Sequence, residues 1–413
     1  MENYDVHINE FNSREEIIEA LDNGTLKKPY VAMIKGVSGN VIDYNTEEGT
    51  DLSKEYLTVK LHTDLEGSFP VIINHQLYSA FTVEYKVSNG EWTSISGQAT
   101  PIIITKNDEI RFKCTDWGYY NGTEIFNRNS PYSFIITGSS PVDVMGNIAS
   151  MTLGDNFTTT ALKNDQVFSG FFKGSNIYSA KNLYLPPEIA THQDGYALLF
   201  WNSTIVEAPD LTAQIVGNYA YYGMFQGCTG LTTAPTISAV MFYPNACDSM
   251  FLSCSNLTTA PALPALTLGV GCYKNMFAMC TSLINAPALP ATTVGIGSYE
   301  QMFVGCSSLL VAPELPATTL YGSCYKGMFG NCTGLTAAPV LPATSITSNE
   351  YKQMFLGCTN LSYVRCLLEE GMEECTDWLS GVAATGVFEK PATSTWSTGA
   401  SGIPEGWTVI DAE

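Results

Sequence analysis

The chain has 413 residues, of which 40 are acidic and 19 are basic, and its formal net charge is −21. A chain of this length accommodates two or three domains, and no run of about eighteen apolar residues predicts a membrane span. Nucleic-acid binding needs clusters of basic residues, so the sparse and acidic charge argues against it.

The first 52 residues predict a small α/β head. Residues 1–16 are polar and acidic, without the apolar core of a secretory signal peptide. Ser13 and Glu16 fit a capping box at the start of a helix, and Asn23-Gly24 favours its end. The expected elements are a helix over about 14–22, strands at 29–35 and 40–44, and an acidic linker at 45–53.

Residues 53–140 predict a small β-sandwich. Apolar residues alternate with polar ones or form short runs between turn signals, which is typical of strands. Ser88-Asn89-Gly90 predicts a two-residue hairpin turn before a strand at 92–95. The other expected strands are 56–62, 71–74, 81–87, 102–105, 110–114 and 132–136.

Residues 141–365 predict a solenoid built from 26-residue rungs. Each Met-Phe pair is followed by a cysteine four residues after the methionine and by a leucine seven residues after it. A fixed period of about 20 to 50 residues is typical of a solenoid, in which each rung stacks only on its neighbours. The segment 146–157 is expected to cap the first rung, and two weaker rungs place Asn176 and Asn202 at the cysteine position. The Met-Phe pairs begin at Met224, Met250, Met276, Met302, Met328 and Met354.

Each rung is expected to hold one short helix and one short strand. In 273–280, a tyrosine, a methionine, a phenylalanine and a cysteine stand at i, i+3, i+4 and i+7, the apolar face of a helix. Glycine or asparagine usually precedes the cysteine and predicts a left-handed helix end, but Ser253 and Met279 depart from this pattern and predict none. The segment Leu-x-x-Ala-Pro-x-Leu-Pro that follows is expected to be extended, with its ladder interrupted at the prolines.

The twelve cysteines predict structural thiols rather than disulfides. Six follow the Met-Phe pairs on the predicted inner face, where free cysteine behaves as a small apolar residue. Cys272 and Cys324 share a second column, but Ser298 and Glu350 fill that column in other rungs, so no repeated bridge is predicted. No Cys-x-x-Cys pair indicates a zinc site. We therefore expect neither a metal nor a cofactor.

Residues 366–413 are expected to cap the last rung. A helix is predicted at 373–379. A solenoid needs its terminal apolar face covered, and the residues expected to cover it are Phe388, Trp396, Ile403, Pro404 and Trp407.

Several motifs recur within the repeat or flank it. They are Leu-Pro-Ala-Thr-Thr-Leu ending at Leu320, Cys-Tyr-Lys-Gly-Met-Phe at 324–329, Gly-Cys-Thr-x-Leu, and the flanks at 146–151, 378–382 and 402–407. With these motifs, roughly residues 141–410 resemble the BspA-like leucine-rich-repeat surface proteins of gut Bacteroidales. The resemblance implies a right-handed leucine-rich-repeat solenoid that serves adhesion or recognition without catalysis. The proline-rich strand departs from the plain leucine-rich consensus.

The head carries a second, shorter pattern of about 25 residues. The segment 23–32, Asn-Gly-Thr-Leu-Lys-Lys-Pro-Tyr-Val-Ala, and the segment 41–45, Val-Ile-Asp-Tyr-Asn, are similar to the start of many virion proteins of Bacteroides phages, including crAss-like phages. The resemblance implies a protein made in the host cytoplasm without a signal peptide and located in the virion. Residues 1–52 would then contact other virion proteins.

Motifs for catalysis are not found in the sequence. The four histidines form no HExxH pair, and no GxSxG elbow, phosphate-binding loop or EF-hand loop is present. A glycosidase needs two carboxylates that flank a cleft, and the acidic residues on the predicted strands are Glu207, Asp210 and Glu314. We expect no catalysis from these three residues. We interpret the paired carboxylates Asp108-Glu109 and Glu369-Glu370 as solvated charges and expect no enzyme.

The candidate binding residues are those that vary between rungs while the frame stays constant, since such positions face outward. Ile284, Leu310 and Val311 form the most apolar part of this set. The full set is Thr232, Thr233, Thr258, Thr259, Ile284, Asn285, Leu310, Val311, Thr336 and Ala337.

These features predict a non-enzymatic phage virion protein, associated with a tail or fibre, whose solenoid binds a glycan or a protein on the Bacteroides host surface. A BspA-like adhesin on the bacterial cell surface is the second hypothesis, and a glycan-degrading enzyme is the third. A rigid spacer with an uncommitted face is the plainest alternative. The sequence leaves open whether the chain forms a homo-oligomer.

Overall fold

The computed structural model describes residues 8–11, 31–34, 41–42, 51–63, 66–76, 82–95, 99–115, 133–158 and 167–412. The chain forms two compact units, residues 1–51 and 52–413. The described residues are mostly β and hold a single α-helix of four residues. Among them, no helix has the length and apolarity needed to cross a lipid bilayer.

The first unit contains a three-stranded sheet. Its strands are β1 (Ile8–Phe11), β2 (Val31–Ile34) and β3 (Val41–Ile42). β2 is parallel to β1 and antiparallel to β3. The strands predicted at 29–35 and 40–44 are therefore confirmed, whereas β1 lies in a polar stretch where none was predicted. The predicted helix at 14–22 lies outside the described residues.

The second unit begins with two sheets, ordered β10-β5-β8 and β12-β11-β4-β9-β6-β7. Six strands are predicted in this region in addition to the hairpin strand at 92–95, and all six are confirmed within a few residues. The strands are β4 (Leu57–Leu61), β5 (Ser68–Gln76), β6 (Thr82–Val87), β7 (Thr93–Ser94), β8 (Ala99–Thr105), β9 (Glu109–Thr115), β10 (Ser133–Gly138), β11 (Val142–Asn147) and β12 (Ile177–Tyr184).

The predicted hairpin forms, with Ser88 and Asn89 at the centre of its turn. The Gly90 N–H donates to the Val87 carbonyl at 2.8 Å, which closes a two-residue turn. β6 and β7 are antiparallel, and Tyr85 opposite Thr93 is the pair nearest the turn, so the register is shifted by one residue from that of a tight hairpin. On its other edge, β6 pairs with β9 along its whole length.

The apolar residues of the two sheets face one another and continue into the repeat. The rings of Phe112 in β9 and Phe134 in β10 are 5.0 Å apart, and Phe134 stacks on Phe171 at 5.5 Å. β11 pairs antiparallel with β4 and parallel with β12, the first strand of the repeat region. One sheet therefore joins the β-region to the first coil.

The segment 146–157, expected as a cap, lies against β4 and β9. It holds helix α2 (Ser150–Leu153) and the 3-10 turn η2 (Gly154–Asn156). The buried Ser150 hydroxyl donates to the carbonyl of Phe112 at 3.1 Å and accepts from the Leu57 N–H at 2.9 Å. This segment therefore links two strands of the sheet that continues into the first coil.

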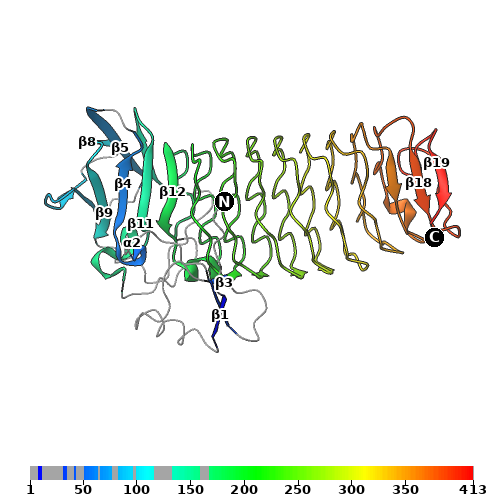
Figure 1. Cartoon of the computed structure of the whole chain (residues 1–413), viewed down its shortest axis with the longest axis horizontal. Helices are drawn as coiled ribbons and strands as arrows, with labels where there is room; N and C mark the ends of the chain where they lie inside the picture. Colours follow the sequence, from blue (N-terminus) through cyan, green and yellow to red (C-terminus); the bar gives the residue numbers. More distant parts are fainter. Residues whose placement is uncertain are drawn as a thin grey trace. The chain divides into compact units, whose positions relative to one another are not determined.

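Beyond β12, successive coils lie side by side as far as β18 (Figure 1). From Met224 to Met354 the coils repeat every 26 residues. The predicted helix in each coil is wrong, because that stretch forms consecutive turns with a left-handed residue every four positions. In one coil, Gly271, Asn275 and Met279 have φ values of 61°, 52° and 61°. Ser253, with a φ of 63°, is also left-handed, so the expected exception at Ser253 and Met279 is wrong as well.

Hydrogen bonds between coils explain why these turns replace a helix. Alternate N–H groups point along the stack: Tyr273 donates to the Ser298 carbonyl, and Phe277 donates to that of Met302, both at 2.9 Å. The N–H groups between them close turns, as from Met276 to the Tyr273 carbonyl at 3.2 Å. An α-helix would use all of these donors internally, and neighbouring coils would lose their ladder.

Side chains of one type stack in columns through the interior. Phe251, Phe277 and Phe303 are fully buried, and their ring centroids are 5.5 and 5.6 Å apart. Tyr299 and Tyr325 stack at 5.7 Å in a parallel column. Near-parallel aromatic pairs at these distances each contribute about 0.5–1.5 kcal/mol beyond their buried area.

The thiols form a third column. All twelve cysteines are free and buried, as predicted. The Cys280 Sγ–H donates to the Phe251 carbonyl of the preceding coil at 3.1 Å, and Cys306 repeats this contact with Phe277 at 3.1 Å. Burial raises the pKa of Cys306 to about 12, so the thiol keeps the proton that it donates.

The first coils differ in register from the prediction. Phe200 stacks on Phe225 at 5.4 Å, an offset of 25 residues rather than 26. Ser203 therefore stands at the cysteine position, with its hydroxyl 3.6 Å from the Cys228 sulfur, and the prediction that Asn202 occupies it is wrong. Asn202 is instead left-handed, with a φ of 54°, at the position before it.

The opposite side of each coil holds very short parallel strands, as the prolines predict. The strands are β13 (Ile215–Val216), β14 (Met241–Phe242), β15 (Thr267–Leu268) and β16 (Thr293–Val294). Single bridges such as Thr233–Thr259 add a second, discontinuous ladder. A short 3-10 helix, η3 (Pro187–Thr191), lies in the first coil.

The chain ends in three parallel strands, β17 (Tyr363–Arg365), β18 (Val387–Lys390) and β19 (Thr408–Asp411). Trp378 stacks on Tyr351 of the last regular coil at 6.3 Å, and Trp396 stacks on Trp378 at 5.2 Å. The predicted helix at 373–379 is wrong. After the 3-10 turn η4 (Met372–Glu374), the segment forms one more set of coil turns, in which the Trp378 carbonyl accepts from Phe355 at 2.9 Å.

Cys247 stands where neighbouring coils have a tyrosine, and Phe242 fills the space, with its ring 5.3 Å from that of Tyr273. We expect Cys247→Tyr alone to overpack and cost about 1–3 kcal/mol. In combination with Phe242→Leu the cost should shrink, with a favourable coupling of at least about 1 kcal/mol in a denaturant double-mutant cycle. As a control, Phe303→Leu combined with Cys247→Tyr should be additive; additivity of the first pair would contradict this packing.

Gly357, which is left-handed, and Gly322, which is not, provide a matched pair of sites for a glycine-to-alanine test. Gly357 has a φ of 75°, and a Cβ there would overlap the side-chain oxygen of Asn331 in the preceding coil. Gly357→Ala should therefore lose more than about 1 kcal/mol of unfolding free energy. A Cβ on Gly322 would lie 3.7 Å from Ile296 without a positive φ, so Gly322→Ala should be neutral or slightly stabilising in the same denaturation assay.

Candidate binding face

All ten candidate residues are exposed and form two adjacent columns on the strand side of the coils. Hydrogen bonds between coils align the first column, as from the Thr258 N–H to the Thr232 carbonyl at 2.8 Å. The Leu310 N–H likewise donates to the Ile284 carbonyl at 3.2 Å. We refer to these two columns as the strand face.

The local sequence explains why two consecutive residues face outward. The preceding leucine, for example Leu283, is fully buried, and the Ala-Pro that follows is partly buried again. A regular strand would place successive side chains on opposite faces, but the prolines interrupt it within two residues. Each coil therefore presents one exposed pair on a constant frame.

The apolar part of the strand face is contiguous. Ile284, Leu310 and Val311 are 44%, 56% and 66% exposed, and they belong to two neighbouring coils. A second apolar patch, which the sequence reasoning missed, contains Val240 and Met241. The sequence could have indicated this patch, because positions that vary between rungs face outward and the apolar pair at 240–241 is replaced by Thr292-Thr293 two rungs later.

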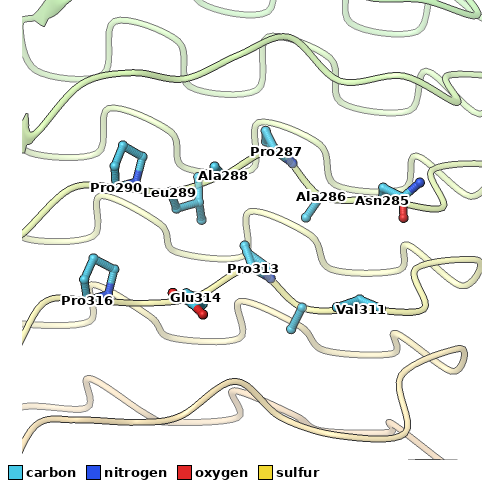
Figure 2. A pocket seen from close by; sticks show the side chains of 11 residues that line it. Asn285, Ala286, Pro287, Ala288, Leu289, Pro290, Val311, Pro313, Glu314 and Pro316 are labelled. Atoms are coloured by element: carbon cyan, nitrogen blue, oxygen red, sulfur yellow. The ribbon is translucent and has the colours of Figure 1, made fainter.

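A groove of about 470 Å³ lies between the proline-rich segments of two adjacent coils (Figure 2). Of the ten candidate residues, Asn285 and Val311 line it. The sequence did not predict this groove, because its walls are the Ala-Pro and Leu-Pro steps that were assigned to the frame. The remaining lining residues are Ala286, Pro287, Ala288, Leu289, Pro290, Ala312, Pro313, Glu314 and Pro316.

The few charges of the repeat are segregated from this face. Five of the seven charged residues between 211 and 361 stand at 26-residue intervals on the turn side: Asp248, Lys274, Glu300, Lys326 and Lys352. Glu350 is fully buried, and its carboxylate accepts from the N–H groups of Thr347 and Ser348 at 3.1 and 2.6 Å. Glu314 is the seventh, and it lines the groove.

The turn-side column contains an ion-pair triad. Glu300 accepts from Lys274 and Lys326 in the adjacent coils, each at 2.9 Å. Burial raises the pKa of the Glu300 carboxyl, but the hydrogen bonds from the two lysines outweigh burial and hold it below its usual value. The triad therefore stabilises the stack when Glu300 is ionised.

Two of the three strand carboxylates, Asp210 and Glu314, lie far apart in the stack. Asp210 and Glu314 share a column but are 104 residues apart. Four steps of about 4.8 Å place them about 19 Å apart, beyond the roughly 5–10 Å that separates the two carboxylates of a glycosidase. Asp108 instead accepts from the Thr105 N–H and the Ser88 hydroxyl, which lowers its pKa within a turn.

His62 combines an aromatic stacking partner with a hydrogen bond to a carboxylate. Its ring stacks on Tyr178 at 3.7 Å, and its Nδ1 is 2.9 Å from Asp143. These residues belong to or adjoin β4, β11 and β12, so the contact lies where the β-region meets the first coil. Among the described residues, no group of three or more histidine, cysteine or acidic side chains is placed to hold a metal ion.

No protein-family model, no curated protein and no solved structure matches the chain.

We expect Glu300→Gln to cost about 0.5–1 kcal/mol of unfolding free energy at neutral pH, since two half-exposed lysines lose their counter-charge. Because the folded pKa is lowered, this contribution is present above the carboxyl's ordinary value of 4.5 and is lost as the pH falls through the folded pKa. Denaturation curves from pH 7 to 3 should therefore converge for wild type and variant. Glu314→Gln, the control, should follow wild type throughout, and parallel curves for Glu300→Gln would contradict the triad.

Proposed function

We propose that the chain is a non-enzymatic virion protein whose coils form a leucine-rich-repeat-type solenoid that binds the surface of a Bacteroides host. The observation that carries the proposal is the contrast between a constant interior and a varied exterior. The Met, Phe, Cys and Leu columns are fully buried in every regular coil, whereas the strand face changes from Thr-Thr at 258–259 to Leu-Val at 310–311.

Such a contrast supports recognition for a physical reason. Because the interior columns and the ladder between coils hold each coil in place, the exposed pair can change without a cost in stability. Repeat solenoids present extended surfaces of this kind to macromolecular partners. The contiguous apolar patch of Ile284, Leu310 and Val311 is the part of the strand face where a partner would remove the most apolar surface from water.

The assignment to a virion rests on the resemblance of residues 23–45 to Bacteroides phage virion proteins. In this proposal the head, residues 1–52, attaches to other virion proteins. The β-sandwich at 53–140 acts as a spacer, and the solenoid at 141–365 with its cap at 366–413 contacts a glycan or a protein of the host.

A BspA-like adhesin on the bacterial cell surface is the second candidate, favoured by the resemblance of residues 141–410. The two locations are separable by mass spectrometry. The virion proposal predicts peptides of this chain in density-purified, nuclease-treated phage particles. Their presence only in the envelope fraction of uninfected cells would favour the adhesin instead.

The apolar part of the strand face provides a direct test of binding. The double variant Leu310→Asp, Val311→Asp should reduce adhesion of the purified chain to host cells at least about tenfold, since truncating a central apolar anchor commonly costs more than 1.4 kcal/mol. Both residues are exposed, so the melting temperature should not change. The matched control Val240→Asp, Met241→Asp, at similarly exposed positions, should adhere as wild type. Equal adhesion of all three proteins would contradict binding through the strand face and would favour the interpretation of the solenoid as a spacer.

A further inference from the structure

The groove between residues 285–290 and 311–316 has walls that are rich in proline. Four of its lining residues are prolines, and Figure 2 shows Pro287 alongside Pro313 and Pro290 alongside Pro316. Prolines present rigid apolar surface without an N–H donor. The groove follows the strand direction over six residues, a length of about 20 Å for an extended chain.

The backbone along this groove is not closed by the ladder between coils. At the corresponding leucine step, bridges Leu211–Ile237 and Leu341–Cys366 join neighbouring coils near the two ends of the repeat. Within the described chain, no such bridge joins Leu289 to Leu315. The N–H groups of Ala288 and Glu314, two exposed residues that line the groove, donate no hydrogen bond to the protein.

The charge of the groove comes from one side chain. Glu314 is exposed, and its column neighbours Ala288 and Val340 are uncharged. Between residues 211 and 361, the other charges lie in the turn-side column or, for Glu350, in the interior. A carboxylate between apolar walls attracts a cation more strongly than one in open solvent, because the walls lower the local dielectric.

These features favour an extended peptide over a sugar. The eleven lining residues include no aromatic ring on which a sugar ring could stack. A peptide strand, in contrast, supplies both backbone hydrogen bonds and alternate side chains to such a groove. We propose that the groove binds an extended segment of a partner protein through a lysine or arginine that pairs with Glu314. The proposal rests on the recognition function and names the chemistry of its partner.

The probe is a set of degenerate octapeptide libraries that differ only at a fixed fourth residue, which is lysine, glutamate or glutamine. The labelled full-length chain should be captured by the lysine library at least about tenfold more than by the glutamate library, with a preference that weakens as salt rises from 50 to 500 mM. Glu314→Gln should lose at least about tenfold of this capture, and Glu314→Lys should reverse the preference.

The control Thr236→Lys adds a charge in the same column three rungs away and should leave the capture unchanged, and melting curves check that each variant is folded. Equal capture of the lysine and glutamate libraries, or a lysine preference that survives Glu314→Gln, overturns the proposal. Capture of glucosamine oligomers that depends on Glu314, without a peptide preference, overturns it in favour of an amino-sugar polymer.

The outcome is separable from that of the recognition function. Host-cell adhesion that is lost in Leu310→Asp, Val311→Asp, without a peptide preference, overturns only the peptide assignment. A peptide preference in a chain that adheres to no host cell overturns only the host-surface function.

Discussion

The structure depends on hydrogen bonds and ring stacking between coils that could not fold alone. Ordering a single 26-residue period costs roughly 1.5 kcal/mol per residue. The large apolar side chains that the period 273–298 buries are only Tyr273, Met276, Phe277, Leu283, Leu289 and Val294. The Phe277 ring contacts the rings of Phe251 and Phe303, and the carbonyls of Phe251 and Phe277 each accept the thiol of the next coil. Stability is therefore shared along the stack rather than stored in any one unit.

Each end of such a stack must be covered by a structure other than another coil. At the first coil, β12 continues a sheet through β11 and β4, so the β-region supplies backbone hydrogen bonds as well as an apolar surface. At the last coil the cover is made chiefly of rings, with Trp378 on Tyr351 and Trp396 on Trp378. The two ends thus use a shared sheet and an aromatic stack to solve the same problem.

The constant interior also separates stability from surface chemistry. Charges that stabilise the stack lie in one turn-side column, where Glu300 alternates with Lys274 and Lys326. The strand side carries exposed apolar and hydroxyl side chains and the carboxylate of Glu314. Changes on the strand side therefore alter what the protein contacts, with little effect on how the coils pack.

The sequence alone determined the period, the buried columns, the reduced thiols and most of the strands of the β-region, because these follow from which residues recur and which are apolar. It did not determine the local conformation of the Met-Phe stretch. Apolar residues three and four apart suit a helix, but they suit successive four-residue turns equally well. The choice is made by alternate N–H groups, such as that of Phe277, which donate to the next coil. The groove beside Glu314 is also a tertiary property, since its two walls come from different coils and the missing ladder between them cannot be read from either wall alone.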